Sequence, residues 1–179
     1  LQYLQLAIES VLNQTFKDFD CFIQFDGIVS TACSDYLNFI NDDRIIITKR
    51  IVNKGLAVSL NELLYKVLPL GYTYIARMDA DDICEPERFE KQISYLDSHN
   101  DCDLVGCNAL LINENSRLIG KKEVKSSFGF LDLIKKNEII HSSVIFRNEF
   151  FNKVGFYDNS LVQGQDYDLW LRAGNKKLK

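Results

Sequence analysis

The sequence has little of what linkers, disulfide frameworks and membrane spans require. Two prolines and nine glycines among 179 residues leave no room for a flexible linker or a low-complexity segment. The five cysteines are odd in number and form no Cys-x-x-Cys pair, so neither a disulfide framework nor a zinc site is indicated. Apolar runs stay below the ~20 residues that cross a bilayer. These absences favour one ordered domain in a reducing compartment.

What is present can build a sizeable core. Hydrophobic residues make up 46% of the chain and charged residues 26%, a composition typical of globular domains. The formal net charge of −4 argues against a nucleic-acid-binding surface. The chain begins with Leu1 rather than Met, and its first residues already read as a helix. We therefore expect a fragment that lacks its true start.

Apolar spacing predicts alternating helices and strands up to residue 112. Strands are expected at 21–25, 44–48, 72–78 and 104–112, and helices at 4–12, 34–40, 56–67 and 86–96. Beyond residue 113 we expect a helix near 130–136, a strand at 143–146, a helix at 148–154 and another from Gln165. The alternation indicates an α/β domain with a mostly parallel sheet, whose ligands bind beyond the carboxyl ends of the strands.

The strongest chemical signal is the acidic segment that follows the expected strand 72–78. Asp79, Asp81 and Asp82 come within four residues. On an extended chain, Asp79 and Asp81 would point to the same side, where two carboxylates repel unless a cation lies between them. A hard divalent ion that also binds a substrate phosphate fits such a pair. The simpler interpretation is an acidic cap for the helix near Pro86.

Other motifs are less specific when each is taken alone. Asp26-Gly27 predicts a turn, and Asn53-Lys-Gly55 predicts a helix cap with a tight turn. Asp166 lies in the first turn of an expected helix, where it could act only as a cap. Trp170 on the same helix is expected in the core. His141, which precedes an apolar strand, is more often structural than catalytic.

Taken in order, these motifs resemble family 2 glycosyltransferases of the GT-A fold, of the bacterial surface-polysaccharide type. The resemblance covers nearly the whole chain, as Asp26-Gly27, Asn53-x-Gly55, Ala76–Ile83 with Pro86-Glu-Arg88, His141-x-Ser143 with Phe146-Arg147, and Gln165–Arg172. It implies a Rossmann-like α/β fold with a mostly parallel central sheet flanked by helices. It also implies a single GT-A domain over residues 1–179 that lacks its first strand and C-terminal residues.

The resemblance implies a role for each of five residues. Asp26 would contact the nucleobase, and Asn53 would lie near the nucleoside pocket. Asp79 would bind toward the ribose, and Asp81 would hold a divalent metal, Mn²⁺ or Mg²⁺, on the diphosphate. Asp166 would be the general base.

The activity that the resemblance implies is transfer of a sugar from a nucleotide-sugar donor, with a UDP-sugar expected. The acceptor would be a growing glycan or a lipid-linked sugar, and direct displacement would invert the anomeric centre. Such an enzyme of the cell envelope would be cytoplasmic, at the inner face of the membrane, with peripheral membrane association and no transmembrane segment.

Several positions depart from the family pattern, and two alternative functions stay open beside it. The usual first strand is absent before Leu1, Gln165 stands where Glu is usual, and no Gln-x-x-Arg-Trp motif occurs. Asp79-x-Asp81 also resembles the nucleophile motif of aspartyl-phosphate phosphatases, although Ile83 replaces their usual Thr or Val. The other alternative is a non-catalytic module that binds nucleotide sugars.

Overall fold

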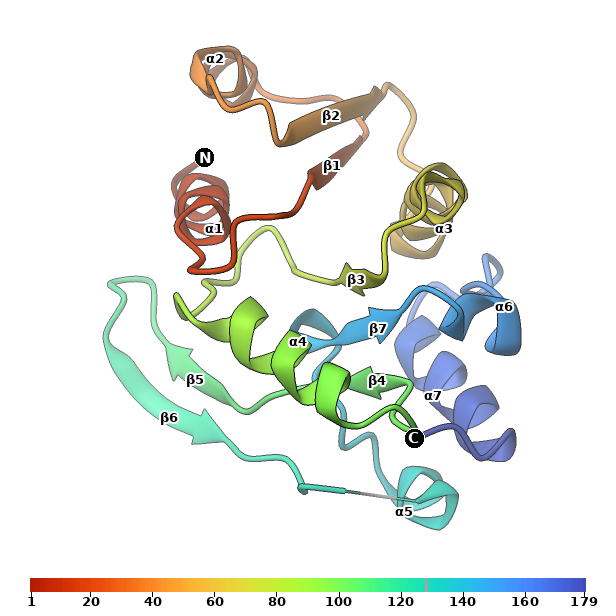
Figure 1. The fold of residues 1–179 in the computed structure, drawn as a ribbon. Coiled ribbons are helices and arrows are strands. Elements are labelled where there is room, and N and C mark those ends of the chain that lie inside the picture. Colours follow the sequence, from red (N-terminus) through yellow and green to blue (C-terminus); the bar gives the residue numbers. More distant parts are fainter. Residues whose placement is uncertain (128) are drawn as a thin grey trace. The chain divides into compact units, whose positions relative to one another are not determined.

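The computed structural model describes residues 1–127 and 129–179 (Figure 1). Its α-helices are α1 (Gln2–Leu12), α2 (Thr31–Phe39), α3 (Leu56–Val67), α4 (Arg88–Ser98), α5 (Phe130–Lys135), α6 (Phe150–Val154) and α7 (Gln165–Asn175). Its strands are β1 (Cys21–Asp26), β2 (Ile45–Arg50), β3 (Tyr74–Ala76), β4 (Leu104–Val105), β5 (Ala109–Ile112), β6 (Leu118–Lys122) and β7 (Ile145–Arg147). Short 3₁₀ turns are η1 (Leu68–Leu70) and η2 (His141–Ser143). In the described ranges, no helix is both long and apolar enough to cross a bilayer.

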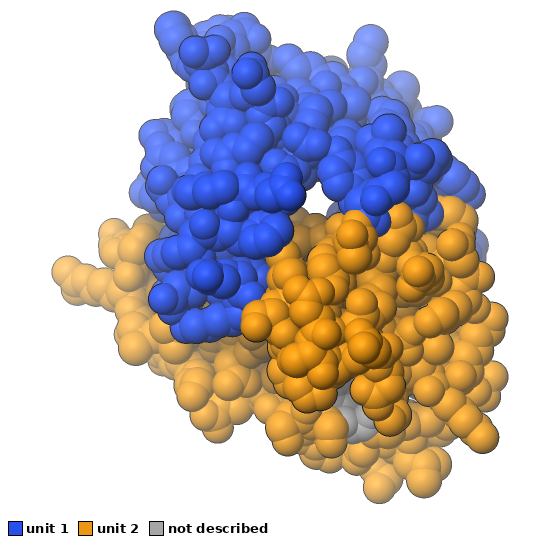
Figure 2. All heavy atoms as spheres, in the orientation of Figure 1, with its two compact units in different colours: residues 1–72, 79–91, 157–165 blue, residues 73–78, 92–156, 166–179 orange. Residues whose placement is uncertain are grey.

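The chain divides into two compact units, which Figure 2 colours separately. Unit 1 comprises residues 1–72, 79–91 and 157–165, and unit 2 comprises residues 73–78, 92–156 and 166–179. The single domain expected from the chain length remains a prediction.

Unit 1 contains the parallel sheet that the alternation predicts. Strands β1 and β2 pair in parallel from Cys21 opposite Ile45 to Asp26 opposite Arg50. Helices α1 and α3 each bury apolar residues that recur at helical spacing. These are Ala7, Ile8 and Val11 on α1, and Ala57, Leu64 and Val67 on α3. The predicted α/β fold, with helices flanking a parallel sheet, is confirmed (Figure 1).

A buried amide ties the end of α1 to the segment that follows the acidic motif. Gln14 is fully buried, and its Nε2 donates to the carbonyl of Glu85 at 2.7 Å. Its Oε1 accepts from the N–H of Phe89 at 2.9 Å. Ser10 Oγ accepts from the N–H of Cys84 at 3.0 Å. Because buried polar groups are costly without partners, these bonds hold residues 84–89 in place on α1.

Unit 2 is built on an antiparallel sheet in the order β3-β7-β4. The strands of unit 2 therefore pair antiparallel, whereas the two strands of unit 1 pair in parallel. Phe146 on β7 stacks on Trp170 of α7 with ring centroids 5.8 Å apart. Trp170 is fully buried, which confirms its predicted place in the core.

The expected strand 104–112 is wrong as a single element, because it is interrupted at Gly106. Strand β4 ends at Val105, and the chain then meets Ser143, whose Oγ accepts from the N–H of Cys107 at 3.1 Å. A Cβ on Gly106 would lie 3.2 Å from that Oγ, so the close approach favours glycine. After the interruption, β5 pairs with β6 in a hairpin whose second strand apolar spacing alone did not predict.

Candidate functional site

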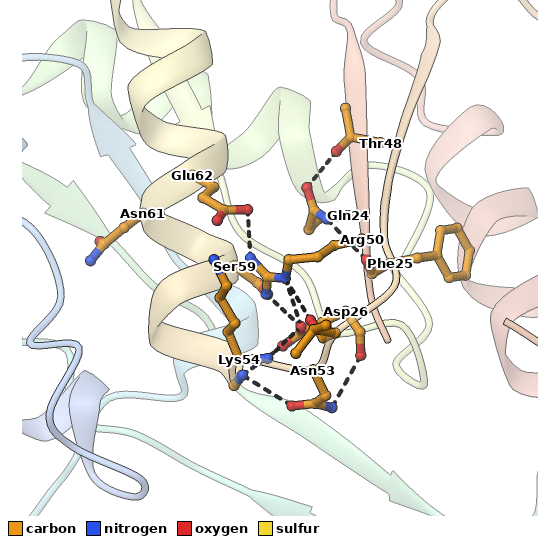
Figure 3. Close-up of polar contacts among 12 residues, drawn as sticks. Gln24, Phe25, Asp26, Thr48, Arg50, Asn53, Lys54, Ser59, Asn61 and Glu62 are labelled. Atoms are coloured by element: carbon orange, nitrogen blue, oxygen red, sulfur yellow. Dashed lines mark hydrogen bonds and ion pairs between the residues drawn. The ribbon is translucent and has the colours of Figure 1, made fainter. Parts of the chain in front are cut away.

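The carboxyl end of β1 brings together the two turn motifs that the sequence left unconnected (Figure 3). Asn53 Nδ2 donates to the backbone carbonyl of Asp26 at 3.1 Å, and its Oδ1 accepts from the N–H of Gly55 at 3.1 Å. Gly27 has φ +115°, and a Cβ there would lie 3.4 Å from the Cβ of Asn53. The backbone geometry and close packing of the Asp26-Gly27 turn against Asn53-x-Gly55 therefore favour glycine at position 27.

The carboxylate of Asp26 is enclosed by hydrogen-bond donors. Its Oδ1 accepts from Arg50 Nε at 3.1 Å and from the N–H of Lys54 at 2.8 Å, and Arg50 Nη2 forms an ion pair with the same oxygen. Its Oδ2 accepts from the N–H of Gly55 at 2.7 Å. The side chain is 16% exposed. Asp26 thus fixes the position of the loop that carries Asn53, whatever else it contacts.

These contacts set the ionisation of the pair. Burial by itself would raise the pKa of Asp26, but the hydrogen bonds from Arg50 and from the backbone of Lys54 and Gly55 bring that pKa below its ordinary value. The hydrogen bond with Asp26 raises the pKa of Arg50. Near neutral pH, the pair is therefore a carboxylate and a guanidinium.

Arg50 is a residue that the sequence reasoning missed. Its Nη2 donates to Ser59 Oγ at 2.9 Å, and its Nη1 lies 2.6 Å from Glu62 Oε2, so it joins the strand end to α3. Arg50 is the register partner of Asp26. The signal was available, because residues that end neighbouring parallel strands meet at one edge of the sheet.

Asn61 is a second residue of unit 1 that the motifs did not reveal. Its side chain is buried, and Nδ2 donates to the carbonyl of Tyr157 and to Asn159 Oδ1, both at 2.8 Å. Its Oδ1 accepts from the N–H of Tyr157 at 3.0 Å. These three bonds hold the segment that leads toward α7.

Residues 79–82 form a turn. The extended backbone that we expected for this acidic motif is therefore wrong. Strand β3 ends at Ala76, and the N–H of Asp82 donates to the carbonyl of Asp79 at 3.4 Å. Asp79 and Asp81 therefore cannot be assumed to point to the same side, because side chains alternate in that way only on an extended backbone. Asp79 is half-buried, whereas Asp81 is exposed.

The donor set fits a divalent cation that shares its ligands with a phosphate. Carboxylate oxygens are hard donors, and Asp81 presents them to solvent. Within residues 1–127 and 129–179, no group of three or more His, Cys, Asp and Glu side chains could hold an ion alone.

Asp166 lies in unit 2, in the first turn of α7, and is positioned by a neighbouring amide. Asn137 Nδ2 donates to Asp166 Oδ2 at 3.1 Å. Asn137 Oδ1 accepts from the N–H of Ile139 at 3.3 Å, which fixes which way the amide faces. Asn137 was not found from the sequence, because no motif marks it.

Asp168, the neighbouring acidic residue on α7, has a structural role. Asp168 pairs with Arg172 one turn later, at 2.8 Å. Arg172 also donates to the carbonyls of Val154 and Phe156, both at 2.8 Å. Asp168 therefore belongs to a packing network. His141 lies edge-on to Trp170, with ring centroids 5.9 Å apart.

Residues 1–156 match the family described as "Glycosyl transferase family 2", and the chain belongs to this family. It is 33% identical to the O-antigen biosynthesis glycosyltransferase WbnJ of Escherichia coli, over 98% of this chain and 68% of that protein. It is 33% identical to the amylovoran biosynthesis glycosyltransferase AmsE of Erwinia amylovora, over 94% of this chain and 63% of that protein. The chain thus spans about three fifths to two thirds of the length of such curated relatives.

Solved structures share the fold. Staphylococcus aureus TarS 1–349 in complex with UDP-GlcNAc superposes with a TM-score of 0.75 at 16% identity, over 97% of this chain and 50% of that chain. The mannosyltransferase PcManGT of Pyrobaculum calidifontis, in complex with GDP-Man and Mn²⁺, gives 0.65 at 11% identity, over 93% of this chain and 46% of that chain. The predicted GT-A fold is confirmed by these neighbours.

Proposed function

We propose that this chain transfers a sugar from a UDP-sugar to a glycan or lipid-linked acceptor, with inversion at the anomeric carbon. The observation that carries the proposal is the match of residues 1–156 to glycosyl transferase family 2. The names of WbnJ and AmsE, which refer to O-antigen and amylovoran biosynthesis, support a polysaccharide acceptor. UDP-GlcNAc in the TarS complex supports a UDP-sugar donor.

Unit 1 holds the residues assigned to the donor. Asp26 and Asn53 form one hydrogen-bonded turn cluster at the end of β1, where polar edges of a base and ribose can be recognised. Asp79 is assigned to the ribose side of the diphosphate. Asp81 would hold Mn²⁺ or Mg²⁺, and a bound ion would neutralise the charge that develops on the diphosphate leaving group.

Asp166 is assigned to the acceptor. As the acceptor hydroxyl attacks the anomeric carbon, Asp166 would take its proton, and one displacement would invert the stereochemistry. Asn137 Nδ2 donates to Oδ2 of Asp166, and in this proposal the proton would go to Oδ1. Asp168 is a poorer candidate because it is engaged by Arg172.

The test is a binding screen followed by a transfer assay. At a hundredfold excess over Kd, a ligand adds ~2.7 kcal/mol of stability, which raises Tm by roughly 5–10 °C for a protein of this size. UDP or a UDP-sugar with Mn²⁺ should give this shift, and GDP should give less. Sugar transfer to a lipid-linked acceptor should then be measured with the donor that binds. Hydrolysis of simple phosphate esters without nucleotide binding would contradict the proposal.

A further inference from the structure

We propose that Tyr167 is a positioning residue, whose hydroxyl holds the end of α5 on α7 so that Asn137 keeps its hydrogen bond to Asp166. All three residues lie in unit 2. The inference rests on the proposed function, because it takes Asp166 as the general base. Tyr167 does not act on the substrate in this account, and its effect reaches Asp166 through Asn137.

The end of α5 is capped by a side chain of α7. A helix leaves its last carbonyls without intrahelical donors, and α5 has six residues. The N–H of Lys136 donates to the carbonyl of Asp132 at 3.1 Å. The Tyr167 hydroxyl donates to the carbonyl of Leu133 at 2.5 Å and lies 3.3 Å from the carbonyl oxygen of Ile134. The hydroxyl therefore supplies a donor that these two carbonyls lack within α5.

The start of α5 is held by close packing against Gly174 of α7. A Cβ at position 174 would lie 3.0 Å from Phe130 Cδ2 and 3.2 Å from Leu133 Cδ1. Glycine weakens a helix interior relative to alanine, and this close approach is a physical reason for its presence. Helix α5 therefore lies against α7 at two points, with Gly174 beside its first residue and Tyr167 beside its last turn.

Burial contributes little to this attachment. Of the six residues of α5, all of which the structure describes, one is buried, Leu133. Leu131 is 73% exposed and Ile134 is 53% exposed. Because so short a helix is unstable by itself, its position depends strongly on the Tyr167 hydroxyl and on the contact with Gly174. Loss of the hydroxyl should therefore loosen α5 while the core of unit 2 stays packed.

The chain that leaves α5 brings Asn137 to Asp166. Asn137 comes two residues after Lys135, the last residue of α5. Its Oδ1 accepts from the N–H of the buried Ile139, and its Nδ2 donates to Asp166 Oδ2 at 3.1 Å. Asp166 directly precedes Tyr167, so the contacts run from the first turn of α7 through α5 and back to that turn. A shift of α5 would draw Asn137 away from the carboxylate.

Tyr167→Phe is the direct test, because it removes the hydroxyl and keeps the ring. Release of UDP from UDP-GlcNAc is measured in the presence of a lipid-linked sugar. We expect kcat to fall about three- to tenfold, as for a small misplacement of a reacting group, with an unchanged KM for the donor. Calorimetry with UDP should give wild-type affinity and stoichiometry, which excludes a loss of folded protein. In the Asn137→Ala background, the same change should add little to the loss of kcat.

Two matched variants accompany this test. Gly174→Ala leaves the hydroxyl in place but forces α5 away from α7, so it should lower kcat with the donor KM unchanged. Tyr74→Phe is the control. The Tyr74 hydroxyl donates to Asp97, and Arg147 Nη1 lies 3.4 Å from it, so this variant removes a hydrogen-bonded hydroxyl of unit 2 whose described partners lie outside α5 and α7. Its kcat should equal that of the wild type.

Hydrogen exchange measured by NMR tests the link to Asn137 without any substrate. The side-chain amide of Asn137 should exchange about threefold faster or more in Tyr167→Phe than in the wild type, as expected when one neutral hydrogen bond is lost. An unchanged exchange rate would overturn the proposal. So would an unchanged kcat in Tyr167→Phe, full additivity with Asn137→Ala, or an equal loss of kcat in Tyr74→Phe. If the wild type transfers no sugar, the proposed function fails, and the exchange rate still decides whether Tyr167 holds Asn137.

Discussion

Asp26 of unit 1 and Asp166 of unit 2 are both carboxylates in sites assigned to substrates, yet their surroundings differ. Asp26 accepts from a guanidinium and two backbone N–H groups. Asp166 accepts from the neutral amide of Asn137. A cation and several donors stabilise the charged form of Asp26, whereas the described side-chain hydrogen bond to Asp166 comes from a neutral amide. The comparison separates a residue that organises a loop from the residue that we propose as the general base.

The sharpest test of the comparison is Asp166→Asn. The amide has nearly the same shape but cannot take a proton, so transfer should fall by about two to four orders of magnitude while donor binding is kept. Steady-state transfer and calorimetry with UDP measure the two effects. If Asp166 were only a helix cap, Asn would cap equally well and turnover would stay near normal.

Asp81→Ala should have the next largest effect, on binding. UDP affinity in Mn²⁺ should fall roughly a hundredfold, the size expected when one partner of a close charge pair is removed. Calorimetry with and without a chelator measures it. The neighbouring exposed Asp82→Ala is the control and should change affinity little. Wild-type affinity that is the same in chelator would remove the metal from donor binding.

Asn137→Ala tests whether the amide acts through Asp166. Loss of the hydrogen bond should let the base move and should lower kcat roughly ten- to hundredfold, as for a misplaced reacting group. In the Asp166→Asn background, the same change should add little to the loss of kcat. Full additivity of the two losses would show that Asn137 acts elsewhere, and thermal unfolding of each variant separates a folding defect from a catalytic one.

Asp26→Asn should have the smallest effect, and the quantity it changes is the free energy of unfolding. The variant loses the charge that Arg50 faces, so unfolding should cost about 1 kcal/mol less at pH 7. The pKa of Asp26 is lowered by folding, so its contribution is present above the unfolded pKa of about 3.9 and is lost as pH falls through the folded pKa. Urea unfolding of both proteins should show the difference shrink below about pH 4, and a constant difference would refute the ion-pair account.

Periodicity was enough to predict the helices and the parallel pair, because α1 and α3 repeat their apolar residues at helical spacing. It could not show that Gly106 would interrupt a strand, since the cause is Ser143, 37 residues later. The sequence analysis also predicted an extended chain past Ala76, whereas residues 79–82 form a turn.

The residues of the candidate site also differ in whether the sequence could reveal them. Asp26, Asn53, Asp79, Asp81 and Asp166 could be proposed from the sequence because they belong to local motifs, and their roles remain predictions. Arg50, Asn61 and Asn137 were missed because their partners lie 24, 96 and 29 residues away. Long-range hydrogen bonds leave no local pattern, and only a register argument could have found Arg50.

The buried amide of Gln14 also bears on the order in which the chain folds. Its partners Glu85 and Phe89 lie 71 and 75 residues later in sequence. Helix α1 can form early from local contacts, but this junction must wait until both distant segments meet, and closing so long a loop is slow. During synthesis, the acidic turn would therefore acquire its support only after residue 89 has left the ribosome.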